Sequence, residues 1–355
     1  MPSYNCLFTP FQTKNLHLAN RVVMAPMTRA KSPGGVPGPD VAGYYKRRAA
    51  NGVGLILTEG TAIDHPAAVS DPAVPRFHGE DALAGWASVL DGVHAVGGKI
   101  MPQLWHVGMR RKPGDLPNPE TMPVGTTMTE TEITGIISAY VRGAANAKRL
   151  GFDGLEIHAA HRYLLDQFFW AAANQRTDRY GGGIAERTRL AAEIVRACRQ
   201  EVGPDFPILL RFSQWKIGDY AARLARTPEE LAVFLEPLAD SGVSVFHCST
   251  RRFWEPEFAG SDLNLAGWTK KLSGKPVITV GSVGLNSDFV TTFAERKDSA
   301  VAGIDRLLAM VESGEVDLVA VGRALLADPV WAAKIRDERT EELEPFRVEL
   351  LQVLT

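Results

Sequence analysis

Short apolar runs recur along the whole chain, and they predict its architecture. Their aliphatic and β-branched residues follow one another without the alternation of apolar and polar positions that a half-exposed strand shows. Strands that are buried on both faces require such continuous runs, which are typical of parallel sheets. We predict eight strands, over residues 21–27, 54–59, 99–105, 154–158, 208–213, 244–249, 276–282 and 317–323.

Segments with helical signals separate most of these runs. Thr227-Pro-Glu-Glu230 and Thr129-Glu-Thr-Glu132 each place a threonine three residues before a glutamate, an arrangement that caps a helix N-terminus. A third helix is predicted over 185–202, where apolar residues recur at helical spacing, and Gly203-Pro204 would end it. Eight strands that alternate with helices predict a (β/α)8 TIM barrel, because parallel neighbours need crossover connections.

The length of 355 residues exceeds a typical domain, but a barrel of eight strand–helix units absorbs it as one. No internal repeat, low-complexity tract or linker indicates a second domain, so we predict a single domain over 1–355. The connections 106–129 and 162–184 are longer than usual, and both follow strand ends where barrels build their sites. The tail 337–355 is highly charged, and its Phe346 could fold back to cover a site.

Composition and charge exclude several functional classes. Hydrophobic residues make up 45% of the chain and charged residues 23%, which are ordinary values for a globular protein. The net charge of −2 provides no basic field for nucleic acid or an anionic membrane, and no apolar run reaches the ~18 residues of a membrane helix. The N-terminus does not resemble a signal peptide. Three scattered cysteines argue against a disulfide framework or an iron–sulfur cluster, and favour a reducing, cytoplasmic location.

Polar side chains stand at the carboxyl ends of several predicted strands, where a barrel core does not need them. The set comprises Thr28, Gln103, His158, His161, Tyr163 and Arg211. Because the carboxyl ends of barrel strands meet at one face, these side chains are predicted to converge there. A buried arginine is costly unless a negative group pairs with it. Arg211 therefore either forms an ion pair with Glu59 or Glu156, or belongs to a shared site.

The seventh and eighth predicted strands end in glycines, at Gly281-Ser-Val-Gly284 and Gly322-Arg323. Backbone amides at such turns can approach an anion, and an arginine adds charge-assisted hydrogen bonds. Barrels often bind phosphate in these two loops, so we favour a site for a mononucleotide such as FMN or for a phosphorylated substrate. The other interpretation, in which the glycines only permit tight turns, stays open.

Two other kinds of site are not indicated. The histidines lack a His-Glu-x-x-His or His-x-His pattern, so no metal is expected. No Gly-x-Gly-x-x-Gly follows a strand and no Walker lysine motif exists, so no separate dinucleotide-binding domain is expected. Any one inward-facing histidine or tyrosine could be a hydrogen-bonded core residue, and only the convergence of several favours a site.

Seven motifs along the chain are weak individually but highly specific together. They are Ala25-Pro-Met-Thr-Arg29, Leu57-Thr-Glu-Gly60, Gln103-Leu-Trp105, Glu156-Ile-His158, Tyr163-Leu-Leu-Asp-Gln-Phe168, Arg176-Thr-Asp-Arg-Tyr-Gly-Gly182 and Val321-Gly-Arg323. On these motifs the chain resembles the old yellow enzyme family of FMN-dependent ene-reductases, from Leu7 to about Pro329. Thr28, where other relatives carry a cysteine, resembles the classical branch of that family.

The resemblance implies a barrel that holds FMN, tightly but not covalently, at the carboxyl ends of its strands. The residues that would contact the flavin are Pro26, Met27, Thr28, Gly60, Gln103, His158 and Arg211. Arg211 would face the pyrimidine side of the flavin, where a cation stabilises the anionic reduced form and raises its potential. The phosphate would be held by Gly281, Ser282, Gly322 and Arg323.

The resemblance also implies an activity, the ping-pong reduction of activated alkenes by NAD(P)H. His158 and His161 would hydrogen-bond the carbonyl or nitro oxygen of the substrate, which stabilises the charge that forms when hydride arrives. Tyr163 would donate the proton at the α carbon, because a phenol with a pKa near ~10 is protonated at pH 7. Thr28 and Trp105 would shape the substrate pocket, and Phe346 is a weaker candidate. The partner would be a small molecule, and the protein a monomer or homodimer.

Two departures from the family pattern bear on this interpretation. Arg162 stands where the family usually has glycine, and a positive φ there would cost a non-glycine residue about 1–2 kcal/mol. Ala171-Ala-Ala173 replaces larger or hydroxylated residues, which would open the rim of the pocket. The alternatives are a reductase of nitroesters or nitroaromatics on the same site, a non-catalytic flavin-binding protein, and a barrel lyase or isomerase. The last would act on a phosphorylated substrate, but no strand ends in a lysine that could form a Schiff base.

Overall fold

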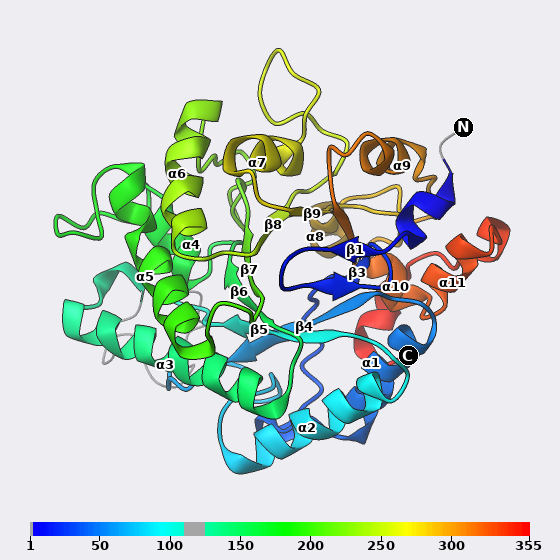
Figure 1. Cartoon of the computed structure of the whole chain (residues 1–355), viewed down its shortest axis with the longest axis horizontal. Helices are drawn as coiled ribbons and strands as arrows, with labels where there is room; N and C mark the ends of the chain where they lie inside the picture. Colours follow the sequence, from blue (N-terminus) through cyan, green and yellow to red (C-terminus); the bar gives the residue numbers. More distant parts are fainter. Residues whose placement is uncertain (1–2, 110–124) are drawn as a thin grey trace.

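The computed structural model describes residues 3–109 and 125–355, and its centre is a closed barrel of eight parallel strands (Figure 1). The strands are β3 (Val22–Met24), β4 (Leu55–Ala62), β5 (Ile100–Trp105), β6 (Leu155–Ala159), β7 (Ile208–Phe212), β8 (Val245–Ser249), β9 (Val277–Val280) and β10 (Leu318–Val321). Each strand pairs with the next one in the sequence, and β10 closes the barrel against β3. Every predicted strand overlaps one of these eight, although β4 and β6 extend beyond the predicted ends at 59 and 158, and the predicted (β/α)8 barrel is confirmed.

Helices surround the barrel and cover the outer faces of the strands (Figure 1). The longer ones are α1 (Pro39–Ala50), α2 (Glu80–His94), α3 (Glu130–Leu150), α5 (Ile184–Val202), α6 (Pro228–Asp240), α7 (Leu265–Ser273) and α9 (Asp305–Glu312). Shorter ones are α4 (Leu164–Phe169), α8 (Phe289–Glu295), α10 (Arg323–Ala327) and α11 (Trp331–Arg336), together with 3-10 turns at Tyr4–Phe8, Pro33–Gly35, Gly125–Thr127, Thr340–Glu342 and Val348–Gln352. No helix in the described parts of the chain is long and apolar enough to cross a membrane.

The three predicted helix boundaries are confirmed by the caps that the sequence indicated. The Thr129 hydroxyl accepts a hydrogen bond from the Glu132 amide, and the Glu132 carboxylate accepts one from the Thr129 amide, which completes a capping box for α3. Thr227 caps α6 in the same way through the amide of Glu230. Helix α5 ends at Val202, and Gly203 follows with a positive φ of 79°.

A short antiparallel hairpin closes the amino-terminal end of the barrel. It consists of β1 (Phe11–Gln12) and β2 (His17–Leu18), and it lies across the centre of the view in Figure 1. Phe11 and Leu18 pack against inward-facing residues of the barrel strands, such as Leu55 and Leu209. This end of the barrel is therefore a filled apolar core, and a ligand has room only at the opposite end.

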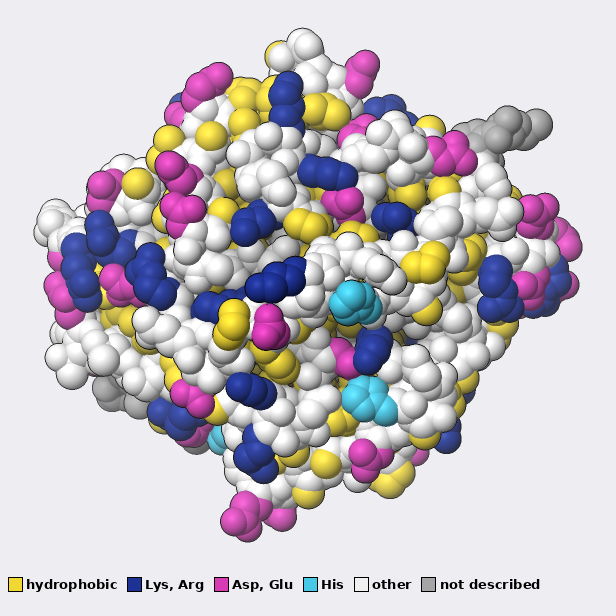
Figure 2. Space-filling model, viewed as in Figure 1, with side chains coloured by type: hydrophobic (Ala, Val, Ile, Leu, Met, Phe, Trp, Pro, Cys, Tyr) yellow, Lys and Arg dark blue, Asp and Glu magenta, His cyan; other side chains and the backbone are white. Residues whose placement is uncertain are grey.

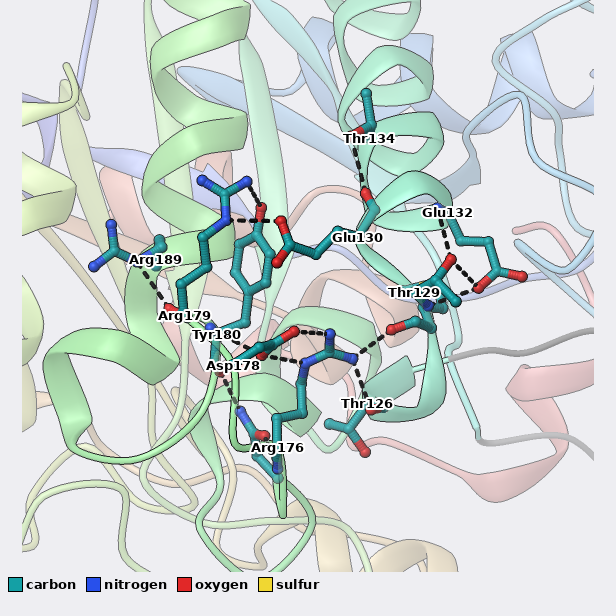
Figure 3. A network of polar contacts seen from close by, with 12 residues as sticks. Thr126, Thr129, Glu130, Glu132, Thr134, Arg176, Asp178, Arg179, Tyr180 and Arg189 are labelled. Atoms are coloured by element: carbon teal, nitrogen blue, oxygen red, sulfur yellow. Dashed lines mark hydrogen bonds and ion pairs between the residues drawn. The ribbon is translucent and has the colours of Figure 1, made fainter.

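The long connection 162–184 is fastened to the start of α3 (Figure 3). The Arg176 guanidinium donates hydrogen bonds to the carbonyl oxygens of Thr126 (2.9 Å) and Met128 (2.5 Å), and it also pairs with Asp178. Arg179 forms a second ion pair with Glu130 at 3.1 Å. The Arg176–Gly182 motif therefore anchors the loop. Much of the other long connection, 106–129, lies outside the described residues.

Charged side chains of both signs are interspersed over the face that Figure 2 shows. This distribution agrees with a net charge of only −2.

We expect Arg176→Ala to lower the free energy of unfolding by about 2–4 kcal/mol, because it leaves two carbonyl oxygens and Asp178 without their partner. The matched control is Arg179→Ala, whose side chain is 50% exposed and should cost less than about 1 kcal/mol. Urea unfolding of both variants measures the difference. Equal losses would show that the motif is not the anchor described here.

Candidate active site

A cavity of about 320 Å³ opens at the carboxyl ends of the barrel strands. All fourteen residues that the sequence proposed for the site line it: Pro26, Met27, Thr28, Gly60, Gln103, Trp105, His158, His161, Tyr163, Arg211, Gly281, Ser282, Gly322 and Arg323. They come from the ends of seven different strands or from the loops after them. The barrel thus assembles one site from residues that are far apart in the sequence.

Several lining residues were missed by the sequence reasoning. Ser249 and Thr250 stand at the end of β8, and the strand-end argument would have found them had it been applied to this strand. Trp215 and Arg251 follow strand ends by a few residues and carried no motif of their own.

The C-terminal tail reaches the cavity through Leu351 and not through Phe346. Phe346 is fully buried, and its backbone exchanges two hydrogen bonds with Ser299, so its ring does not line the cavity. One Arg29 nitrogen donates to the carbonyl oxygens of Leu350 (2.9 Å) and Val353 (2.6 Å) and thereby holds the tail in place.

His158 and His161 form one wall of the cavity together with Tyr163. The Nδ1 atom of His158 accepts a hydrogen bond from the Ala160 amide at 3.2 Å, so its proton is assigned to Nε2. Burial, followed by the charge of Arg211, holds the pKa of both imidazoles well below the usual value. Both histidines are therefore neutral at pH 7, and each carries one N–H donor.

Tyr163 is held between two aromatic neighbours. Its ring lies edge-on to that of Trp105, with centroids 4.8 Å apart, and edge-on to that of His158 at 5.0 Å. The phenol is thereby placed next to the imidazoles without stacking on them. A phenol and two neutral imidazoles consequently share one side of the cavity.

The turn that carries these residues has an unusual backbone. His161 and Arg162 both have positive φ, at 63° and 64°, which residues other than glycine rarely adopt. The Arg162 amide donates to Asp166 at 2.6 Å, and Asp166 forms an ion pair with Lys216 at 2.6 Å in which both side chains are fully buried. This pair fixes the strained turn, although burial still raises the pKa of Asp166.

The two departures from the family pattern lie outside the cavity. The Arg162 guanidinium sits over the ring of Trp170, 5.2 Å from its centroid, and does not line the cavity. The residues Ala171 to Ala173 do not line it either. Arg162 does occupy a positive-φ position, so the strain that the sequence made conditional on such a φ applies here.

Arg211 is a buried cation with few partners. Among the described residues, Arg211 forms no salt bridge with Glu59 or Glu156. The two carboxylate oxygens of Glu156 instead bind Gln103 (2.7 Å) and His247 (2.6 Å). Its Nε has no hydrogen-bond partner in the described part of the chain. Burial lowers the pKa of Arg211, which Glu156 partly offsets. Buried polar groups are normally hydrogen-bonded, so this Nε is available to an acceptor in the cavity.

The opposite end of the cavity is formed by the loops after β9 and β10. Gly281 has a φ of 147°, and a Cβ atom there would lie 2.6 Å from the Thr250 hydroxyl, so the tight turn itself requires glycine. Arg323 is buried and donates to the carbonyl oxygens of Ser287 (2.6 Å) and Asp288 (3.4 Å). Its terminal nitrogens thus hold the neighbouring loop, and Arg323 also lines the cavity.

Glu59 supports the turn after β3 that carries Thr28. Its Oε2 accepts hydrogen bonds from the amides of Arg29 (2.8 Å) and Ala30 (2.9 Å), and its Oε1 has no partner among the described residues. Burial raises the pKa of Glu59 to about 7, against the opposing effect of these hydrogen bonds. No cluster of three or more His, Cys, Asp or Glu that could hold a metal ion occurs within 3–109 or 125–355.

The sequence and the fold both match known oxidoreductases. The model of a family described as "NADH:flavin oxidoreductase / NADH oxidase family" matches residues 6–342. The chain is 34% identical to an NADH oxidase of Thermoanaerobacter brockii, over 97% of this chain and 52% of that protein, so it spans about half of that relative. It is 34% identical to a putative 12-oxophytodienoate reductase 2 of Oryza sativa subsp. japonica, over 91% and 85% of the two chains. A solved structure of morphinone reductase in complex with tetrahydroNAD superposes with a TM-score of 0.75 at 28% identity, covering 94% of this chain and 90% of that one.

We expect Arg162→Gly to be more stable than Arg162→Ala by about 1 kcal/mol, although glycine usually destabilises relative to alanine. At a φ of 64° alanine keeps the left-handed strain and glycine does not. Both variants lose the contact with Trp170, so the difference between their free energies of unfolding reports the backbone strain alone. Chemical denaturation measures it, and an alanine variant of equal or greater stability would contradict the expectation.

Glu59 should make stability depend on pH. The folded state raises the pKa of this acid and therefore favours its protonated form. Its contribution to the free energy of unfolding is complete below the unfolded pKa, near 4.5, and is lost as pH rises through about 7. Glu59→Gln keeps an oxygen acceptor but does not ionise. The variant should therefore match the wild type near pH 4.5 and exceed its stability by on the order of 3 kcal/mol at pH 8, as measured by urea unfolding. A constant difference across this range would contradict the assignment.

Proposed function

The chain belongs to the NADH:flavin oxidoreductase / NADH oxidase family, which includes the old yellow enzymes, and we propose that it reduces the C=C bond of activated alkenes. It is an FMN-dependent enzyme that uses NAD(P)H as reductant. The proposed substrates are α,β-unsaturated carbonyl or nitro compounds, which would enter the cavity in turn with the coenzyme in a ping-pong order. The observation that supports this choice is the wall of two neutral histidines and one tyrosine.

The residues around the cavity fit FMN. The unpartnered Nε of Arg211 would be satisfied by an acceptor at the pyrimidine side of a flavin. The Gln103 amide nitrogen is bound to Glu156, so its oxygen is left to accept from a ring N–H. The other residues proposed to hold the group are Pro26, Met27, Thr28, Gly60 and His158 at the ring, and Gly281, Ser282, Gly322 and Arg323 at the phosphate. Bound FMN supplies the hydride transfer between NAD(P)H and the substrate.

His158 and His161 would bind the oxygen of the substrate. Each neutral imidazole has one N–H to donate, and two donors on one oxygen stabilise the negative charge that develops there during reduction. Because the pKa of each imidazole is depressed, both stay neutral near neutral pH, and each keeps a single N–H donor and a single acceptor nitrogen. Thr28 and Trp105 would bound the pocket on the sides that flank the histidines.

Tyr163 would supply the proton that completes the reduction. Its ring is held by Trp105 and His158, which would present the hydroxyl to a substrate whose oxygen is bound at the histidines. A phenol is protonated at neutral pH and can act as a general acid toward the α carbon. The tail would cover one side of the same cavity through Leu351.

Two of the alternative functions differ in how well the site supports them. Nitroesters or nitroaromatics also present an oxygen that the two histidines could bind, so their reduction is a second candidate on the same site. A Schiff-base lyase is disfavoured, since no lysine of the described chain lines the cavity.

We expect Tyr163→Phe to slow the reduction of an enone by 10²–10⁴-fold, the usual contribution of a positioned general acid. The reduction of bound flavin by NAD(P)H should change only severalfold, because no substrate proton is transferred in that half-reaction. Stopped-flow absorbance resolves the two half-reactions. Equal losses in both would argue against the role of Tyr163, and purified protein that stays colourless after reconstitution with FMN would overturn the proposed function itself.

A further inference from the structure

The hydroxyl of Ser249 lies between two groups of the proposed site. Ser249 is the last residue of β8 and is 3% exposed. Its Oγ is 2.8 Å from Nε2 of His161 and 3.4 Å from Nη2 of Arg211. It therefore connects the histidine on the substrate wall with the arginine proposed to face the flavin.

The chemistry of each group limits where the protons lie in this chain of contacts. A guanidinium only donates hydrogen bonds, so the oxygen of Ser249 accepts from Arg211. Accepting from the Arg211 cation polarises the Ser249 O–H, which favours donation of its single hydrogen to Nε2 of His161, although the second lone pair of the oxygen also allows the reverse direction. In a neutral imidazole the proton must then be on Nδ1.

With this direction of donation the two histidines are opposite tautomers. His158 accepts at Nδ1 from the Ala160 amide and carries its proton on Nε2, whereas His161 accepts at Nε2 and carries its proton on Nδ1. In each ring the nitrogen engaged by the protein is the acceptor, and the N–H is left for the cavity that the ring lines. With the reverse tautomer, His161 would present a lone pair to the substrate oxygen and would repel it.

The surroundings of His161 hold the ring but do not distinguish its two nitrogens. Trp215 stacks on one face, with centroids 4.7 Å apart and planes 28° apart, and His158 lies edge-on at 5.2 Å. The His161 backbone amide donates to the hydroxyl of Ser213 at 3.1 Å, which fixes the main chain only. Among the described residues, Ser249 makes the one polar contact that selects between Nε2 and Nδ1.

We propose that Ser249 is a positioning residue that fixes His161 as the Nδ1-protonated tautomer and thereby as a hydrogen-bond donor to the substrate oxygen. The proposal rests on the proposed function for the identity of that ligand. The tautomer itself is a property of the protein and can be measured without turnover.

The first test is ¹⁵N NMR of the FMN-bound protein labelled at histidine, with the His161 signals assigned by their loss in His161→Gln. We expect a protonated Nδ1 and an unprotonated Nε2 in the wild type and in Ser249→Thr, which keeps the hydroxyl. Ser249→Ala should shift His161 toward the Nε2-protonated form. The matched control Ser213→Ala should leave the tautomer unchanged, and His158 should stay Nε2-protonated throughout.

A protonated Nε2 in the wild type would overturn the proposal, and so would a His161 tautomer that does not respond to Ser249→Ala. The wild-type spectrum decides the assignment even if the alanine variant does not fold. These outcomes are separate from the proposed function, because a protein that binds FMN without reducing alkenes would still report its histidine tautomers.

A second test measures binding of 4-hydroxybenzaldehyde to the oxidised holoenzyme from the change in flavin absorbance. We expect Ser249→Ala to raise the dissociation constant about tenfold, the usual consequence of losing one well-placed hydrogen bond. Ser249→Thr should stay within about twofold of the wild type. Equal affinities in the alanine variant and the wild type would show that Ser249 does not prepare His161 for the ligand.

Discussion

One buried carboxylate, that of Glu156, organises the polar half of the barrel interior. Its two oxygens bind Gln103 and His247 at 2.7 and 2.6 Å, and its charge favours the charged form of Arg211. Removing one member of such a buried set leaves an uncompensated group and typically costs 3–5 kcal/mol. Glu156 stands two residues before His158 on β6, so the same strand holds Gln103, which lines the cavity, and carries one of the histidines of its wall. The buried polar cluster and the histidine side of the cavity therefore share one strand.

The turn after β6 shows how the fold tolerates a costly local conformation. Two consecutive non-glycine residues, His161 and Arg162, have positive φ, and strain of this kind persists only where the surroundings over-determine it. The buried pair of Asp166 and Lys216 provides that constraint from α4 and from the segment after β7. The strained residues lie next to the proposed catalytic groups. In this turn His161 contacts Ser249, and Tyr163 lines the cavity.

Much of this organisation could be predicted from local sequence features. Continuous apolar runs identify all eight strands because burial on both faces excludes alternation. Thr129 and Thr227 identify helix starts because a cap depends on residues only three positions apart. The rule that strand ends meet at one face was sufficient to place Thr28, Gln103 and Arg211 around one cavity. These predictions succeeded because each depends on periodicity or short spacing within one segment.

The sequence by itself determined the barrel, the position of its site and the chemical groups present there. Only the tertiary structure decided which of these groups touch. The contact between His161 and Ser249 spans 88 residues. The carboxylate of Glu156 binds Gln103 and His247, and it forms no salt bridge with Arg211 among the described residues. The tail reaches the cavity with Leu351 rather than Phe346. Such contacts depend on distances and orientations between segments that no local pattern encodes. The division reflects a physical difference, since element type follows from local burial and capping, whereas hydrogen-bond partners follow from packing of the whole chain.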